Sequence, residues 1–230
     1  MNVVASTDRQ ELEERARQSL GASDEAIYKR VAGILKDRGA RGELLVDVGC
    51  GTGNLWPFVG DQFDRYIGVD AIRYEDFPED AELILADLDK GDLSLPAACA
   101  DAVVAVETIE HLENPRAFMR SIVRIAKPGG WVLVTTPNQL SLLSLMTLVF
   151  KHRFSAFQDA SYPAHITALI EADLKRIASE CKLLDIEIDY SRKGRIILSP
   201  WHFPRFISNT FPRALSDNLI LIGRKASGNP

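Results

Sequence analysis

The chain has 230 residues, of which 46% are hydrophobic and 26% charged, and a formal net charge of −5. A chain of this size and apolar content buries roughly 70 to 75% of its unfolded surface, which predicts one globular domain and excludes a disordered or collagen-like chain. The acidic balance disfavours nucleic acid as a partner, because neutralising phosphates requires clustered Lys and Arg. The three cysteines, at wide and irregular spacing, predict neither a disulfide framework nor a zinc knuckle.

No targeting or membrane-spanning segment is expected. Residues 1–10 lack a basic stretch followed by an apolar one, and no run reaches the ~18 apolar residues of a membrane span. Together with the absence of a disulfide pattern, this predicts a cytoplasmic protein.

Residues 8–38 predict two amphipathic helices, because apolar residues recur there at helical spacing. From residue 44, short apolar runs alternate with helical stretches, among them a helix from Pro115 to Lys127 and another over 168–181. The runs predict strands at 44–48, 66–70, 82–86, 102–106, 131–136, 183–190 and 218–224. This alternation is typical of an α/β fold with a parallel sheet covered on both faces, and the last two strands are close enough in sequence to pair antiparallel.

The segment DVGCGTGN, residues 47–54, lies between the first strand and a predicted helix. Glycines there allow a sharp turn and a close approach of the backbone to a ligand. Their spacing is G-x-G-x-G, whereas dinucleotide-binding loops have G-x-G-x-x-G, and Asp47 lies two residues before the first glycine. A carboxylate at that position repels a diphosphate but can hold an ammonium group, so the loop predicts a ligand with a cationic end.

Two further carboxylates end the next strands. Asp70 ends the second strand, where it can accept hydrogen bonds from both hydroxyls of a ribose, and Asp87 ends the third, where it suits the exocyclic amino group of adenine. The expected ligand therefore has an adenine, a ribose and an amine.

The chain resembles the class I S-adenosylmethionine-dependent methyltransferases, in particular the ubiquinone-type and type 11 and 23 group. The resemblance covers about residues 40–190 and is carried by VDVGCGTGNL, YIGVD, ADLD, DAVVAVETIEHLENP and KPGGWVLVTTPN, in this order. It implies a Rossmann-like, seven-stranded, mostly parallel sheet with an antiparallel last strand and helices on both faces, which binds S-adenosylmethionine. The cofactor-binding residues it implies are Asp47, Gly49, Cys50, Gly51, Gly53, Asp70, Ala71, Asp87, Leu88 and Glu107.

A second cluster follows the fourth strand. If one helical turn begins at Glu107, then Glu107, Glu110 and His111 share a face, and His165 is expected at the same edge of the sheet. Carboxylates and imidazoles that converge on a cleft can bind Mg²⁺ or Zn²⁺. The E-x-x-E-H string resembles ubiquinone-type O-methyltransferases and small-RNA 3′-end 2′-O-methyltransferases, in which a metal held by this motif polarises the acceptor hydroxyl.

Other roles for this cluster stay open. His111 or His165 can remove the proton of the acceptor directly as a general base, with Glu107 as a further catalytic residue. Alternatively, Glu107 contacts the cofactor, Glu110 caps a turn and His111 packs behind the fifth strand.

Two segments are expected to cover the acceptor. Residues 140–154 are apolar and end in Lys151, His152 and Arg153, which suits a lid or an interfacial helix at the inner membrane face. A second stretch, around 199–212, is rich in aromatic residues and proline. The alternative is that both segments pack on each other as ordinary core.

We therefore expect a single methyltransferase domain over 1–230. Residues 1–40 form N-terminal helices, 41–137 the cofactor-binding core, and 138–165 and 195–215 the cover over the acceptor. The predicted function is O-methylation of a small-molecule, sugar or lipid-linked acceptor. A small-RNA 3′-end 2′-O-methyltransferase and a non-catalytic S-adenosylmethionine-binding regulatory protein are the alternatives.

Overall fold

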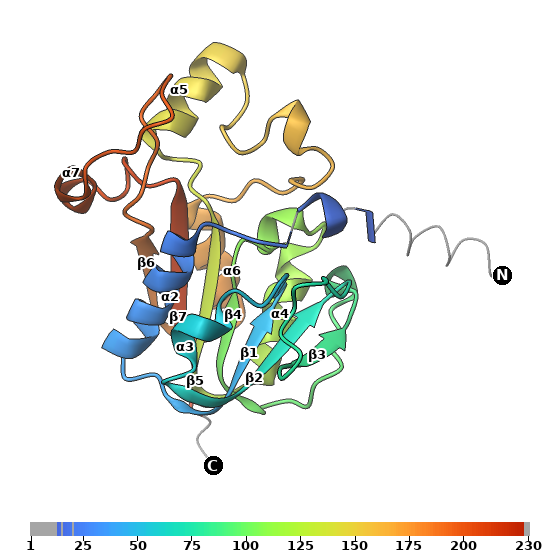
Figure 1. Ribbon diagram of the computed structural model, residues 1–230. Helices are drawn as coiled ribbons and strands as arrows, with labels where there is room; N and C mark the ends of the chain where they lie inside the picture. The colour runs from blue at the N-terminus through green and yellow to red at the C-terminus, as the bar shows by residue number, and fades with distance from the viewer. Residues whose placement is uncertain (1–12, 15, 20, 228–230) are drawn as a thin grey trace.

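The fold is one seven-stranded sheet with helices on both faces (Figure 1), in a computed structural model that describes residues 13–14, 16–19 and 21–227. The strands are β1 (Gly42–Val48), β2 (Phe63–Asp70), β3 (Glu82–Leu85), β4 (Ala100–Ala105), β5 (Ala126–Pro137), β6 (Leu183–Tyr190) and β7 (Asn218–Lys225). The α-helices are α2 (Glu25–Asp37), α3 (Trp56–Val59), α4 (Pro115–Ile125), α5 (Leu142–Lys151), α6 (Glu171–Glu180) and α7 (Arg205–Thr210). The part of the chain that the structure describes also contains the short 3₁₀ helices η1 (Leu88–Lys90), η2 (Ile109–His111) and η3 (Asp159–Ser161).

The strands lie in the order β3-β2-β1-β4-β5-β7-β6. The first five pair in parallel, whereas β7 runs antiparallel to both of its neighbours, β5 and β6. The Rossmann-like sheet with an antiparallel last strand, predicted from the sequence, is confirmed. The chain reverses direction across the sheet between β1 and β4, and open parallel sheets bind ligands in the crevice that opens there.

Two hydrophobic clusters form the core, one on each face of the sheet. One contains the apolar stripes of α4 and α6, including Phe118 and Leu174, both fully buried. The other contains α2 and α3, including Leu35 and Val59. Because helices cover both faces of the sheet, the central strands are continuous apolar runs, and these runs allowed the strands to be predicted from the sequence.

Several boundaries differ from the predicted ones by a few residues, and the largest difference is at the junction of α4 and β5. The helix expected to reach Lys127 ends at Ile125, because Ala126 already pairs with Ala100 in the sheet and β5 begins there. The strand expected at 131–136 is therefore longer, and a register shift accommodates its first residues. Of the first predicted N-terminal helix, residues 13–14 and 16–18 are helical, and residues 8–12, 15 and 20 lie outside the described part of the chain.

The segments after β5 and after β6 lie beyond the carboxyl ends of the strands, with α5 and α7 projecting there (Figure 1). The predicted apolar helix is present as α5. In the part of the chain that the structure describes, no helix is long and apolar enough to cross a bilayer.

Candidate functional site

The loop after β1 turns at glycines that other residues cannot replace. Gly49 and Gly51 have φ angles of +76° and +53°, a backbone region that side chains disfavour. A Cβ on Gly49 would lie 2.2 Å from Thr108 Oγ1, and one on Gly51 would lie 2.0 Å from the carbonyl oxygen of Gly21. Both glycines line a cavity, so the loop presents bare backbone to whatever occupies it.

Asp70, at the end of β2, holds this loop in place. Its Oδ2 accepts a hydrogen bond from the Gly51 N–H (2.8 Å) and its Oδ1 accepts one from the Ala71 N–H (2.7 Å). The side chain is buried beside the cavity, and burial raises its pKa. Each carboxylate oxygen has a second lone pair, so the capacity to accept further hydrogen bonds remains.

Asp47 is a buried carboxylate with one unpartnered oxygen. Its Oδ2 accepts a hydrogen bond from the Tyr66 hydroxyl (2.7 Å), whereas its Oδ1 has no partner among the described residues. Burial raises the pKa of Asp47 to about 7, the neighbouring Asp70 adds to this effect, and the bond from Tyr66 opposes it. An unpaired buried charge is costly, so this site favours a cationic ligand.

Three of the predicted cofactor residues, Asp87, Gly53 and Cys50, either lie outside the cavity lining or have a packing contact inside the protein. Asp87 caps η1 by accepting from the Asp89 N–H (3.1 Å) and pairs with Lys90 (3.0 Å), and it is not among the described residues that line the cavity, whereas Leu88 is. Gly53 also lies outside the lining. Cys50 lines the cavity but packs on Gly68, where a Cβ would lie 2.7 Å from its Sγ.

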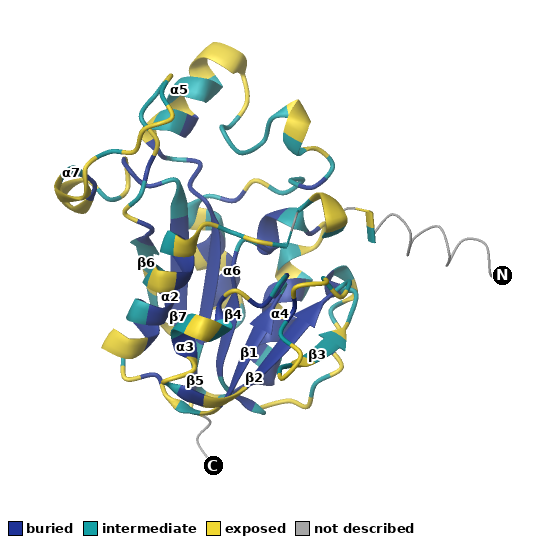
Figure 2. Cartoon of the chain, in the orientation of Figure 1, coloured by how far each residue is buried: buried dark blue, intermediate teal, exposed yellow. Residues whose placement is uncertain are grey.

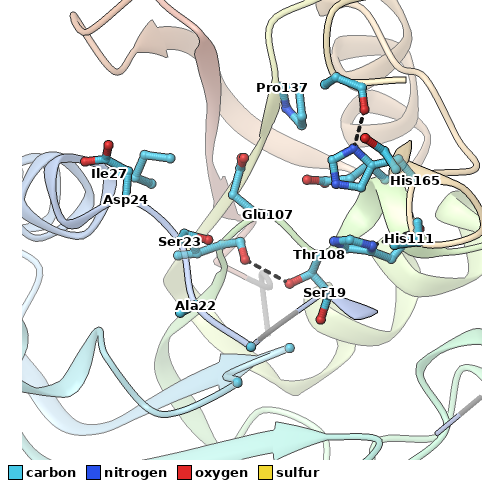
Figure 3. Close-up of a pocket in the computed structure, with 18 of the residues that line it drawn as sticks. Ser19, Ala22, Ser23, Asp24, Ile27, Glu107, Thr108, His111, Pro137 and His165 are labelled. Carbon is cyan, nitrogen blue, oxygen red and sulfur yellow. Dashed lines mark hydrogen bonds between the residues drawn. The ribbon is translucent and has the colours of Figure 1, made fainter. Parts of the chain in front are cut away.

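The segment before α2 lies over the glycine loop, which the sequence analysis did not predict. The Thr52 N–H donates to the carbonyl of Gly21 (2.9 Å), and the Tyr74 hydroxyl donates to the carbonyl of Ala16 (2.5 Å). Ser19, Ala22 and Ser23 line the same cavity as His111 and His165 (Figure 3). A contact between segments 31 residues apart leaves no periodic signal in the sequence, although a glycine between two predicted helices was visible at position 21.

Glu110, His111 and His165 converge on one point. One ligand-type atom from each lies within 4.8 Å of the others, and the two imidazole rings meet edge to face with centroids 4.8 Å apart. His111 comes from η2 after β4, and His165 from the segment between α5 and α6. The sequence predicts these residues at one edge of the sheet, and in the structure they lie together there.

Glu107 lies apart from this group (Figure 3). The predicted helical turn does not begin at residue 107, because Glu107 has a φ of +51° and the 3₁₀ turn covers only Ile109–His111. Its carboxylate instead accepts from the Thr135 hydroxyl (3.0 Å) and from Asn218 Nδ2 (2.5 Å), while it still lines the cavity. The expectation that Glu107 shares a face with Glu110 and His111 is therefore wrong.

Both histidines have a defined tautomer. Nδ1 of His111 lies 2.8 Å from the carbonyl oxygen of Ala164, and Nδ1 of His165 lies 2.7 Å from that of Ala156. Since a carbonyl only accepts, both Nδ1 atoms carry a proton, and in the neutral form of either ring the lone pair is on Nε2. Burial lowers the pKa of His165, which favours its neutral form.

Glu110 is fully buried, and neither of its carboxylate oxygens has a hydrogen-bond partner among the described residues. The Thr136 hydroxyl approaches it without meeting hydrogen-bond geometry. Burial raises the pKa of Glu110 well above its usual range, and the charge of Glu107 adds to the effect. Buried oxygens without partners mark a place where a proton, a cation or a ligand hydrogen-bond donor is held.

A model of the "Methyltransferase domain" family matches residues 16–182 of the chain. The chain belongs to the class I S-adenosylmethionine-dependent methyltransferases. The matched range includes the glycine loop, Asp70 and all members of the Glu110 group. Among curated proteins, this methyltransferase is 32% identical over 120 residues to a Mycolicibacterium smegmatis protein named "Probable S-adenosylmethionine-dependent methyltransferase", which covers 51% of the chain and 45% of the relative.

The methyltransferase is also 29% identical over 126 residues to the mitochondrial ubiquinone biosynthesis O-methyltransferase of Rattus norvegicus, covering 50% of the chain and 36% of the relative. The match therefore spans less than half the length of these curated relatives. Among solved structures, an S-adenosylmethionine-dependent methyltransferase from Archaeoglobus fulgidus superposes with a TM-score of 0.61 at 19% identity, over 86% of this chain and 94% of that one. This likeness shows the fold.

A second solved structure is the 1,6-didemethyltoxoflavin-N1-methyltransferase of Burkholderia thailandensis with bound 1,6-didemethyltoxoflavin and S-adenosylhomocysteine. It superposes with a TM-score of 0.61 at 14% identity, over 97% of this chain and 89% of that one. This likeness also shows the fold, whereas membership of the family supports S-adenosylmethionine as the cofactor.

Proposed function

We propose that the protein transfers the methyl group of S-adenosylmethionine to a hydroxyl oxygen of a small-molecule, sugar or lipid-linked acceptor. The observation that carries this proposal is a single cavity of about 940 Å³ lined both by the glycine loop and by Glu110, His111 and His165. Pockets of roughly 300 to 1,000 Å³ hold drug-sized ligands, so the cavity has room for the cofactor and an acceptor together.

The residues around β1 and β2 fit the cofactor. The unpartnered oxygen of Asp47 suits the ammonium group of the methionine portion, and the free lone pairs of Asp70 suit the ribose hydroxyls. The glycine loop lets the cofactor lie against backbone. When bound, the cofactor supplies a methyl group that its positive sulfur already activates, so alignment with the acceptor provides much of the acceleration.

His165 is arranged to take a proton. The carbonyl of Ala156 holds the ring proton on Nδ1, so the lone pair of the neutral ring is on Nε2. An acceptor hydroxyl hydrogen-bonded to this Nε2 becomes a better nucleophile as its proton is withdrawn, and burial lowers the pKa of His165, which favours the neutral form that this role needs.

As an alternative to the general base, Glu110, His111 and His165 fit a metal ion, which would take the Nε2 lone pair of His165. Two imidazole nitrogens and one carboxylate form the donor set of many catalytic zinc sites. Here the backbone carbonyls of Ala164 and Ala156 accept from the Nδ1 atoms and hold the two rings in orientation. Such an ion would satisfy an unpartnered oxygen of Glu110. This donor set suits Zn²⁺ better than Mg²⁺, which prefers oxygen ligands. A bound ion would lower the pKa of the acceptor hydroxyl.

Release of S-adenosylhomocysteine tests the proposal. The purified protein is incubated with S-adenosylmethionine and, in turn, a catechol, a disaccharide, a polyprenyl phenol and a single-stranded RNA with a free 3′ end. We expect turnover with one of the first three and a methyl group on oxygen by mass spectrometry. His165→Gln should abolish turnover, and His152→Gln, whose exposed ring lies outside the cavity lining, should not.

Two results would contradict the proposal. Turnover with RNA alone would assign the protein to the 2′-O-methyltransferases that act on small RNA. Binding of the cofactor without turnover on any acceptor class would favour a non-catalytic regulatory protein.

A further inference from the structure

Residues 138–165 and 195–215, hereafter the cap, form one unit beyond the carboxyl ends of the strands (Figure 1). Backbone and side-chain hydrogen bonds join the two segments. Asn138 Nδ2 donates to the carbonyl of Arg213 (2.7 Å), and the Leu142 N–H donates to the carbonyl of Ala214 (2.7 Å). The α5 helix and the segment around α7 are thus held together at the same end of the molecule.

The α5 helix has a wide apolar face but is poorly covered. Its sequence is LLSLMTLVFK, in which Ser144, Thr147 and Lys151 share one face and all other residues are apolar, and Ser144 is its one buried residue. Val149 and Phe150 are 66% and 73% exposed. The apolar face of an amphipathic helix is normally packed against a protein core or lies against lipid. Here the described part of the chain leaves most of it uncovered, as the exposed surface of α5 in Figure 2 shows.

Exposed hydrophobic side chains gather on the cap. Of the eleven large ones exposed in the described part of the chain, nine belong to the cap: Leu142, Leu145, Val149, Phe150, Tyr162, Leu198, Trp201, Phe206 and Phe211. The remaining two, Leu85 and Leu184, lie on strands of the sheet. Such a concentration at one end marks an interaction surface, whereas scattered exposed residues do not.

The cap is basic although the chain is acidic. The whole chain has a net charge of −5, but the cap has one acid, Asp159, and five basic residues: Lys151, Arg153, Arg195, Arg205 and Arg213. Arg153 pairs with Asp159, and the arginines at 195 and 213 pair with acids outside the cap. In the described part of the chain, Lys151 and Arg205 have no such ion pair, and both are exposed beside the apolar residues.

We propose that the cap docks the protein on the surface of an anionic phospholipid bilayer. At 1.5 Å per residue, α5 is about 15 Å long, half of the ~30 Å hydrocarbon core, so it lies along the interface instead of crossing it. Lys151 and Arg205 meet the anionic headgroups, and Tyr162 and Trp201 sit at the depth that these residue types prefer. A second copy of the chain is disfavoured as the occupant, because it would place the same positive charges face to face.

Docking would bring the cavity to the membrane. Tyr162 and His202 belong to the cap and also line the cavity. An acceptor dissolved in the bilayer would then enter from the docked side, and this extension rests on the proposed function. Docking itself is independent of catalysis and is measured separately.

Vesicle flotation tests the docking surface. The full chain is mixed with vesicles of phosphatidylcholine alone or of phosphatidylcholine with phosphatidylglycerol. We expect flotation with the anionic vesicles, weakened by added salt, and little with the neutral ones. Replacing Lys151 and Arg205 by Gln should lower the partition coefficient roughly fivefold for each charge, about 25-fold together. Val149→Ser with Phe150→Ser should abolish flotation.

The matched control is Leu85→Ser. Leu85 is 52% exposed, comparable to Val149 and Phe150, but it lies on β3, away from the cap. This variant should float like the wild type. Calorimetry with S-adenosylhomocysteine should give wild-type affinity for all variants, which shows that they are folded.

No flotation of the wild type, or equal flotation of the cap variants, would overturn the proposal. A dimer that light scattering detects in the wild type but not in the Val149–Phe150 variant, without flotation, would overturn it in favour of a contact between copies. Loss of turnover with intact flotation would refute only the proposed function.

Discussion

Asp47 should make the affinity for the cofactor depend on pH near neutrality. The carboxyl is 2% exposed, and burial raises its pKa to about 7 in the absence of a ligand. If the ammonium group of the cofactor pairs with the unpartnered Oδ1, binding requires the ionised form. Below pH 7 the carboxyl must first lose its proton, and this requirement weakens binding.

The expected size follows from proton linkage. Affinity for S-adenosylhomocysteine falls by up to tenfold for each pH unit below the pKa, which amounts to roughly eightfold between about pH 7.5 and about pH 6. The amino group of the ligand is that of a free amino acid, whose pKa lies above this range, so it stays mainly protonated and does not reverse the trend.

Isothermal calorimetry across this pH range measures the change in affinity, and two variants test whether Asp47 causes it. Asp47→Asn should bind more weakly than the wild type near pH 7.5 and should lose most of the pH dependence. Tyr66→Phe removes the hydroxyl that donates to the ionised Asp47, so the pKa of Asp47 rises and the midpoint of the profile should move to higher pH. A flat wild-type profile, or a midpoint that moves to lower pH in Tyr66→Phe, would refute the assignment of Asp47 to the ammonium group.

Three more outcomes are expected. Asp70→Ala should weaken S-adenosylhomocysteine binding about tenfold or more by calorimetry, and unchanged affinity would show that Asp70 serves only to hold the glycine loop. Gly51→Ala should lower the free energy of unfolding by ~1 to 3 kcal/mol in urea titrations, because its Cβ would overlap the carbonyl of Gly21; an unchanged midpoint would mean that the segment over the loop moves aside freely. Stripping divalent ions should lower turnover, and adding Zn²⁺ or Mg²⁺ should restore it. Native mass spectrometry should show less bound metal in Glu110→Gln and His165→Ala than in the wild type. Full activity in the presence of a chelator would exclude a catalytic metal.

The sequence alone predicted the sheet and one half of the site. Buried parallel strands are continuous apolar runs, and residues near their carboxyl ends, such as Asp47 and Asp70, must meet at one edge of the sheet. The same rule placed His165 beside His111 although 53 residues separate them. These inferences depend only on strand direction, which the order of elements along the chain determines in a parallel sheet.

The direction in which each side chain points was decided by the tertiary structure. Glu107 is aimed at Asn218, 111 residues away, by a left-handed backbone that no local pattern requires. The contact of Gly21 with the glycine loop was also not predictable from the sequence. The hydrogen bond from Thr52 joins two segments that are distant in sequence and share no pattern that would pair them. The exposure of α5 is likewise a property of the folded chain: an apolar run in the sequence is compatible with core or with surface, and only the positions of its neighbours determine which of the two it becomes.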